Sequence, residues 1–222
     1  FLGDMYFKVN IYENFVRIFN KDFISPLSNT GKLHYRYYMI DTLMIGNSRC
    51  YQIKYFPKIK GEPVFIGDMY IDATDYAVKR IETAISPEIN INYLNDIWVI
   101  QEYEKIDSIA WMITREEVKA KFNIIKKSKL FGFQGFKTTT RSKFSFENKN
   151  PPNFMTIPSE IVVNPDSEAK GEEYWVDKRH EKLNEKDQGI IDMTDTLKNN
   201  KTYKALNKLA TLGYSGYLPL GP

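Results

Sequence analysis

Apolar and polar residues alternate along most of the first two thirds of the chain, with the period of two that marks a strand between core and solvent. In the segment VKAKFNI, Val118, Ala120 and Phe122 fall on one face, while Lys119 and Lys121 fall on the other. Short turns rich in Gly, Pro, Asn and Asp separate the segments of this kind. About eight strands joined by such turns predict an antiparallel sheet.

The clearest hairpin spans residues 63–82, PVFIGDMYIDATDYAVKRIE, in which two strands flank the turn sequence Ala-Thr-Asp. Its aspartates, Asp68, Asp72 and Asp75, suggest either a site or a turn. They are spaced too widely for a calcium-binding loop, which needs several oxygen ligands close together. Aspartate favours turns because its side chain bonds to nearby backbone N–H groups, so we expect these residues to shape the hairpin.

The composition changes near Asn148, where a segment with four prolines and no sustained period begins. After it, Asn184 is placed to cap a helix that has Glu185 and Asp187 in its first turn, and a second helix is expected before Gly213. We therefore predict a sheet over residues 1–147, a connecting segment over 148–174 and a helical segment over 175–222. The predicted fold class is α+β and mainly antiparallel β: a strongly curved sheet, or half-barrel, of about eight strands packed against the C-terminal helices.

Composition and charge exclude several functions. The chain of 222 residues has a net charge of +3, which is too balanced for a dedicated nucleic-acid binder. Its only cysteine, Cys50, cannot form an internal disulfide, and we expect a buried thiol there. Two isolated histidines make no zinc site, and the sequence has no nucleophile-elbow, phosphate-loop or dinucleotide-binding motif. We therefore expect no catalytic residue, metal or cofactor.

Large apolar residues provide two candidate binding surfaces. The first is the apolar concave face of the predicted sheet, since an exposed patch of this kind marks a binding site; it comprises Phe65, Met69, Ile71, Trp98 and Trp111. The second is Trp175 with Arg179, four residues apart, because both residue types are common at interaction hot spots. The alternative for this pair is structural: Trp175 would fill the sheet's core and Arg179 would pair with a carboxylate.

Several phrases, in their order along the chain, resemble a family of uncharacterised outer-membrane proteins of Gram-negative bacteria of the Bacteroidetes type. They include FISPLS, YRYYMIDT, RCYQIKYFPK, FIGDMYIDATDYAVKRI and YWVDKRHEKLNEKD. The resemblance implies the middle, periplasmic region of a longer exported protein, between a carboxypeptidase-regulatory-like β-sandwich and a C-terminal β-barrel. The start FLGDMYFKV and the end SGYLPLGP agree with that expectation.

The hairpin phrase and the order of sheet then helices also resemble the lipoprotein-carrier fold, in which a curved sheet shelters acyl chains. The first functional hypothesis is therefore a non-enzymatic periplasmic module that binds a lipid or other hydrophobic ligand, a partner protein or its own barrel. A second is an envelope-polymer hydrolase or metal enzyme, which would need Asp68, Asp72 and Glu82 to converge in a cleft. A third is a structural spacer whose concavity its own side chains fill. The oligomeric state stays open.

Overall fold

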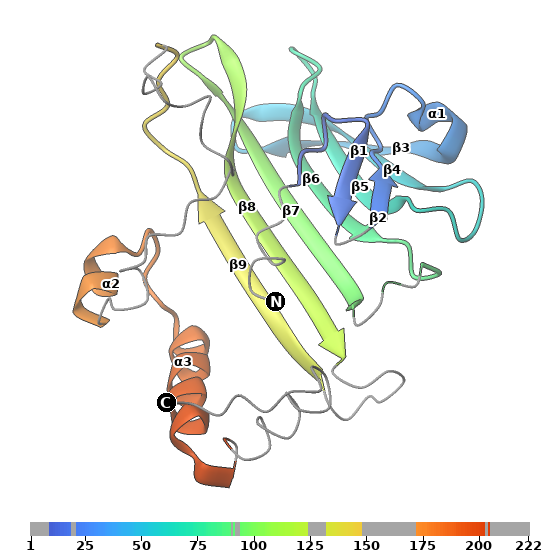
Figure 1. The fold of residues 1–222 in the computed structure, drawn as a ribbon. Helices are drawn as coiled ribbons and strands as arrows, with labels where there is room; N and C mark the ends of the chain where they lie inside the picture. Colours follow the sequence, from blue (N-terminus) through green and yellow to red (C-terminus); the bar gives the residue numbers. More distant parts are fainter. Residues whose placement is uncertain are drawn as a thin grey trace. The chain divides into compact units, whose positions relative to one another are not determined.

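The computed structural model describes residues 9–18, 21–89, 91, 94–123, 132–147, 172–202 and 204. The chain divides into two compact units, Phe1–Lys149 and Asn150–Pro222. The first unit holds all the described strands and one short helix, and the second holds two helices (Figure 1).

The first unit is built on a seven-stranded antiparallel sheet in which each strand pairs with its neighbours in sequence. Its strands are β3 (Tyr35–Ile45), β4 (Ser48–Pro57), β5 (Phe65–Asp72), β6 (Val78–Ile85), β7 (Leu94–Ile106), β8 (Ala110–Asn123) and β9 (Gly132–Thr140). The sheet is open, with β3 and β9 at its edges. The prediction of a mainly antiparallel β fold is therefore confirmed, with seven strands in the main sheet.

A second, two-stranded sheet precedes the main one, and the alternation pattern did not predict it. It consists of β1 (Phe15–Ile18) and β2 (Lys21–Ile24), and the one-turn helix α1 (Gly31–His34) follows. Its buried residues Val16, Ile18 and Phe23 belong to the same hydrophobic cluster as Phe65 and Met69 of β5. The rings of Phe23 and Phe65 lie 5.2 Å apart. The small sheet therefore covers one face of the main sheet and closes the core there.

A glycine allows the central strands to approach closely. Gly67 on β5 is the register partner of Tyr55 on β4, whose side chain is fully buried. A Cβ atom at Gly67 would overlap the carbonyl oxygen of Glu82 and lie 2.9 Å from the Tyr55 hydroxyl. That hydroxyl donates a hydrogen bond of 3.4 Å to the same carbonyl oxygen. Any larger residue at position 67 would push these strands apart.

The core also holds a polar network that fixes the start of the described chain. The buried Gln101 donates through Nε2 to the carbonyl oxygen of Val9 and to Oε2 of Glu116, each at 2.7 Å. The hydroxyl of Tyr103 donates to Oε1 of Gln101 at 2.9 Å, and Lys137 Nζ lies 3.3 Å from Oε1 of Glu116. Because each buried polar group has a partner, the network adds stability instead of a desolvation penalty.

The second unit contains α2 (Glu172–Lys178) and α3 (Glu185–Asn199). The side chain of Asn184 accepts a 2.9 Å hydrogen bond from the backbone N–H of Asp187, so the predicted N-cap of α3 is confirmed. Most of the second predicted helix, 201–213, lies outside the described residues. Within the described part of the chain, no helix has the length and apolar character that crossing a membrane requires.

Candidate functional site

The five residues predicted to form one apolar surface do not share a face. Phe65 and Met69 are core residues, 2% and 3% exposed, and Ile71 and Trp111 pack against the same core. Trp98 is 53% exposed. The prediction of a single surface is wrong, because Trp98 faces the side of the sheet opposite the core, in or against which the other four residues lie.

Alternation along β7 explains the position of Trp98. The neighbours of Trp98, Ile97 and Val99, are buried, so the indole points to the opposite, solvent-facing side of the sheet. On that side Ile66, Ala84 and Trp98 are cross-strand partners on β5, β6 and β7. These three residues form a continuous apolar row on the solvent-facing surface.

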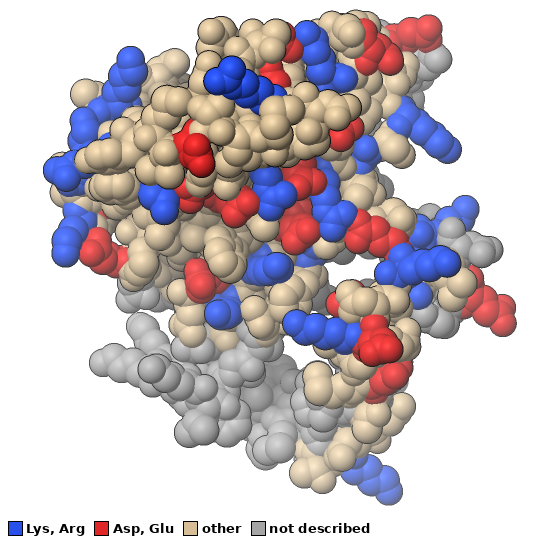
Figure 2. Space-filling model, turned by 180° about the vertical axis from the view of Figure 1, so that it is seen from behind, with Lys and Arg blue, Asp and Glu red and all other residues tan. Residues whose placement is uncertain are grey.

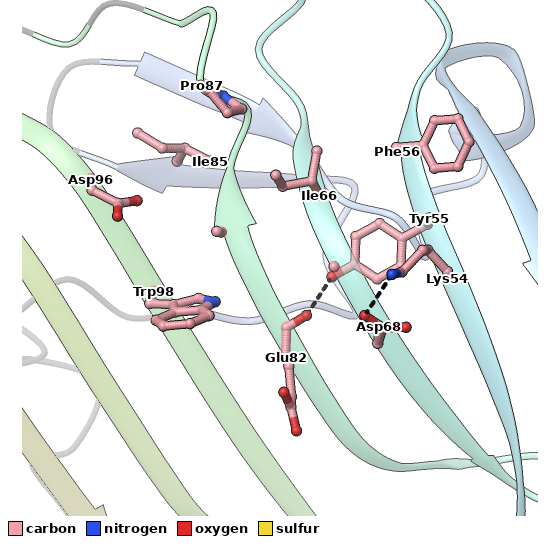
Figure 3. Close-up of a pocket in the computed structure, with 12 residues that line it drawn as sticks. Lys54, Tyr55, Phe56, Ile66, Asp68, Glu82, Ile85, Pro87, Asp96 and Trp98 are labelled. Atoms are coloured by element: carbon pink, nitrogen blue, oxygen red, sulfur yellow. Dashed lines mark hydrogen bonds and ion pairs between the residues drawn. The ribbon is translucent and has the colours of Figure 1, made fainter. Parts of the chain in front are cut away.

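This row forms part of a groove of about 530 Å³ on the solvent-facing side of the sheet (Figure 3). Its apolar lining residues are Phe56, Ile66, Ala84, Ile85, Pro87 and Trp98, and we call this site the sheet groove. Its volume falls within the range of small-molecule sites, about 300–1,000 Å³. Sequence reasoning identified Trp98 but missed the rest, because only the strand pairing brings residues of β4, β5 and β6 into one groove with it.

Charged side chains border the sheet groove, and most are paired. Asp68 accepts a 3.0 Å hydrogen bond from Gln52 and lies 3.9 Å from Lys54 Nζ. Glu82, the register partner of Asp68, receives Arg80 Nε at 2.8 Å. Asp96 also lines the groove, and within the described residues it has no ion-pair partner.

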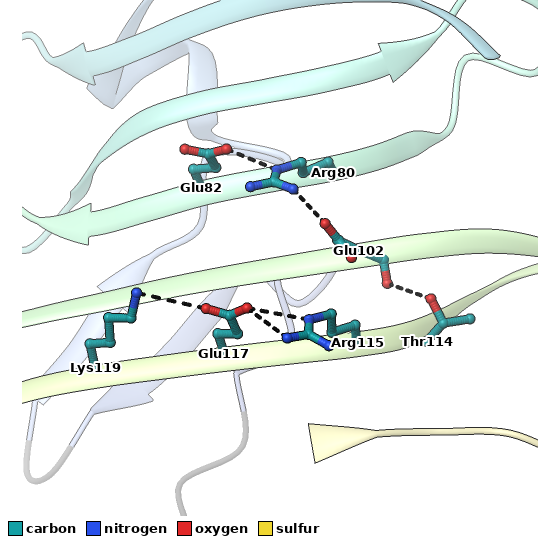
Figure 4. Close-up of polar contacts among 7 residues, drawn as sticks. All are labelled: Arg80, Glu82, Glu102, Thr114, Arg115, Glu117 and Lys119. Atoms are coloured by element: carbon teal, nitrogen blue, oxygen red, sulfur yellow. Dashed lines mark hydrogen bonds and ion pairs between the residues drawn. The ribbon is translucent and has the colours of Figure 1, made fainter. Parts of the chain in front are cut away.

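The same face carries two groups of ion pairs, one that joins β6 to β7 and one within β8 (Figure 4). Arg80 bridges Glu82 and Glu102, and on β8 Glu117 joins Arg115 at 3.0 Å and Lys119 at 3.7 Å. Seen from behind, acidic and basic side chains lie side by side across the middle of the molecule (Figure 2). The solvent-facing surface therefore combines an apolar groove with a neutralised charged band.

Of the three hairpin aspartates, Asp72 shapes the turn, as the sequence predicted. Oδ1 of Asp72 accepts the backbone N–H groups of Thr74 at 2.8 Å and Asp75 at 2.9 Å. Burial disfavours the ionised form of Asp72, but the N–H groups of Asp75 and Thr74 outweigh it and lower the pKa of the carboxyl. The carboxylate of Asp75 accepts hydrogen bonds from Lys105 Nζ at 2.8 Å and from Trp111 Nε1 at 2.9 Å. Both contacts lower the pKa of Asp75, and Lys105 has the larger effect.

The three acids required by the enzyme hypothesis do not converge in one cleft. Asp68 and Glu82 line the sheet groove, whereas Asp72 lines a separate cavity at the hairpin ends. Within the described residues, no group of three or more His, Cys, Asp and Glu side chains could hold a metal ion. Cys50 is buried, as predicted, and burial raises the pKa of its thiol.

The second predicted surface lies on α2. Trp175 is 42% exposed and packs edge-to-face against Tyr174, with 5.3 Å between the ring centroids. The backbone N–H of Arg179 donates to the carbonyl oxygen of Trp175 at 2.9 Å, which continues the helical turn. The indole of Trp175 is therefore not a fully buried core group.

Comparison with known proteins assigns the first unit to a family. A family model described as a family of unknown function, DUF5686, matches residues 2–146. The chain belongs to the DUF5686 family. Comparisons with curated proteins and with solved structures found no match.

The DUF5686 match covers the whole seven-stranded sheet and both of its faces. The sheet groove and the cavity at the hairpin ends therefore lie inside the family region. The helices α2 and α3, with Trp175, lie outside it. Both cavities of the first unit are therefore candidates for a function common to DUF5686 domains.

Proposed function

We propose that this DUF5686 domain is a non-enzymatic binding module whose sheet groove holds an acyl chain. The observation that carries the proposal is the exposure of Trp98 in a groove lined mainly by apolar side chains. Burying a large apolar side chain contributes about 1.5–3 kcal/mol, and covering the exposed half of Trp98 supplies about half of that. An acyl chain along the row of Ile66, Ala84 and Trp98 removes this surface from water.

The charges around the groove support one class of lipid head group. Three carboxylates, of Asp68, Glu82 and Asp96, line the groove with one ammonium group, that of Lys54. Asp96 precedes Trp98 by two residues on the same strand, so their side chains lie about 7 Å apart on one face. A lipid ammonium group placed there would meet the free carboxylate of Asp96 and the face of the indole. We therefore propose a zwitterionic lipid with an amine-bearing head group.

Binding accounts for the groove better than catalysis does. The carboxylates of Asp68 and Glu82 are each held by a neighbouring basic or amide side chain, so neither stands ready to transfer a proton. The remaining acid of the enzyme hypothesis, Asp72, uses one oxygen to bind its own turn. A spacer with no ligand would leave the exposed indole of Trp98 without a role.

Isothermal titration of the full chain with short-chain phosphatidylethanolamine tests the proposal. Wild type should bind saturably, and Trp98→Ser should weaken binding about tenfold, which corresponds to 1.4 kcal/mol. Trp175→Ser is the matched control, because it removes another half-exposed indole outside the groove and should leave affinity unchanged. Phosphatidylglycerol lacks the ammonium group, so it should bind wild type more weakly than phosphatidylethanolamine does. Asp96→Asn should bind the two lipids with equal affinity. Absence of binding, or equal binding by Trp98→Ser, would overturn the proposal.

We also propose a setting for the module: the periplasmic face of the outer membrane, within a longer exported protein. The order of the resembling phrases along the chain supports this setting. We propose in addition that the sheet is strongly curved and that the C-terminal helices pack on one face of it. Cell fractionation with protease protection tests the location, and lysine cross-linking between α3 and the sheet strands tests the packing.

A further inference from the structure

A second cavity lies at one end of the sheet, where three hairpin turns meet. Its volume is about 450 Å³. The lining comes from β3–β4, β5–β6 and β7–β8, the three hairpins that turn at this end: Asn47, Ser48, Arg49, Asp72, Thr74, Asp75, Lys79, Glu104, Lys105 and Trp111. Nine of these ten side chains are polar or charged, so the cavity differs in character from the sheet groove. We call it the hairpin cavity.

The structure fixes two of the cavity's carboxylates with internal donors. Asp72 binds the N–H groups of its own turn, and Asp75 receives both Lys105 and Trp111 on its Oδ2 atom. Within the described residues, Oδ1 of Asp75 has no hydrogen-bond partner, so it can accept a hydrogen bond from a ligand. The cavity thus presents a positioned acceptor on a rigid turn.

Two basic side chains of the cavity remain available. Arg49 and Lys79 line it, and among the described residues neither forms an ion pair. Lys79 Nζ lies 5.7 Å from the centroid of the Trp111 ring. Lys105 pairs with Asp75, and the carboxylate of Asp72, which has no ion pair, binds the N–H groups of its own turn. The charged groups left without an ion pair or such a hydrogen bond are Arg49, Lys79 and Glu104. A complementary ligand therefore carries a negative charge that pairs with Arg49 and Lys79. It also carries hydroxyl groups that donate hydrogen bonds to the carboxylate oxygens of the cavity.

We propose that the hairpin cavity binds a sugar unit that carries an anionic group, either a carboxylate or a phosphate. The anionic group lies between Arg49 and Lys79, and a sugar hydroxyl donates to Oδ1 of Asp75. Because Lys79 lies over the indole of Trp111, an anion that binds Lys79 changes the surroundings of that ring. The fluorescence of Trp111 therefore reports binding.

The test uses the full chain with Trp98→Phe and Trp175→Phe, which leaves Trp111 as the sole tryptophan. Fluorescence is followed during titration with glucuronate, glucose 6-phosphate, glucose and inorganic phosphate. At least one anionic sugar should bind saturably, and which of the two binds more tightly identifies the anionic group. Glucose should bind at least tenfold more weakly. Arg49→Gln and Lys79→Gln should each weaken binding about tenfold, as loss of one charge-assisted hydrogen bond requires.

Arg36→Gln is the matched control, because Arg36 is also an exposed arginine but lies at the other end of β3 and does not line the cavity. It should leave binding unchanged, and Arg49→Lys should restore part of the affinity lost in Arg49→Gln. Thermal unfolding of each variant shows that it is folded. No saturable change with either anionic sugar would overturn the proposal, as would equal affinity for glucose. Inorganic phosphate binding as tightly as glucose 6-phosphate would mean an adventitious ion only.

Discussion

Replacing Gly67 by alanine should destabilise the first unit although it adds only one methyl group. The new Cβ atom would overlap the carbonyl oxygen of Glu82 on the paired strand and lie 2.9 Å from the Tyr55 hydroxyl. Overpacking of a core costs about 1–3 kcal/mol, and the upper part applies here because the obstacle is backbone. Alanine also lowers the entropy of the unfolded chain, which offsets about 0.4–1 kcal/mol. The expected net loss is therefore about 2 kcal/mol.

Urea unfolding followed by circular dichroism in the far ultraviolet measures this loss. With a slope of about 2 kcal/mol per molar urea, the midpoint should fall by about 1 M. Gly189→Ala is the control, since a Cβ at that position in α3 meets nothing within 4 Å. It should leave the unfolding of the sheet unchanged and raise the stability of α3 slightly. A wild-type midpoint for Gly67→Ala would refute the close approach of β4, β5 and β6.

Four other outcomes are expected. Arg80→Gln should lower the unfolding free energy by about 1 kcal/mol in low salt and by less in high salt, because two half-buried carboxylates lose their partner. Arg17→Gln, which breaks an exposed ion pair, should lower it by less. Gln101→Leu should lower the unfolding free energy by about 1–3 kcal/mol, since it leaves buried partners unsatisfied. Because the folded state lowers the pKa of Asp72, the ionised carboxylate stabilises the fold above the unfolded-state pKa, about 4, and this stability is lost as the pH falls through the folded pKa. In an acid titration, the unfolding free energy of Asp72→Asn should therefore fall less steeply with decreasing pH than that of wild type. Asn184→Ala should reduce the helicity of the second unit, measured by circular dichroism, at a cost of about 1 kcal/mol.

The alternation of the sequence predicted most of the main sheet, because each strand has one buried and one solvent-facing side. It also contained the information that Trp98 faces away from Ile97 and Val99. It could not show which face of the sheet is covered. That depends on β1 and β2, four-residue strands too short to show a period, whose position comes from contacts distant in sequence such as Phe23 with Phe65. For this reason the sequence did not show that Phe65 and Met69 lie in the core instead of on an exposed apolar surface.

The turn chemistry was predictable because it is local. Aspartate binds backbone N–H groups two and three residues ahead, and Asp72 does so with Thr74 and Asp75. The hairpin cavity was not predictable, because it needs the register of three hairpins to bring Arg49, Lys79 and Trp111 together. Contacts within a few residues can be inferred from sequence, whereas sites built across strands need the pairing itself.

Native mass spectrometry of the full chain, purified gently from a bacterial envelope, tests the central claim most directly. We expect an added mass equal to that of a phospholipid with an amine-bearing head group, lost on denaturation and reduced in abundance in Trp98→Ser. It also predicts that Trp175→Ser retains the added mass. A bare polypeptide mass for the wild-type protein would contradict the claim that the sheet groove holds a lipid, as would an adduct equally abundant in Trp98→Ser.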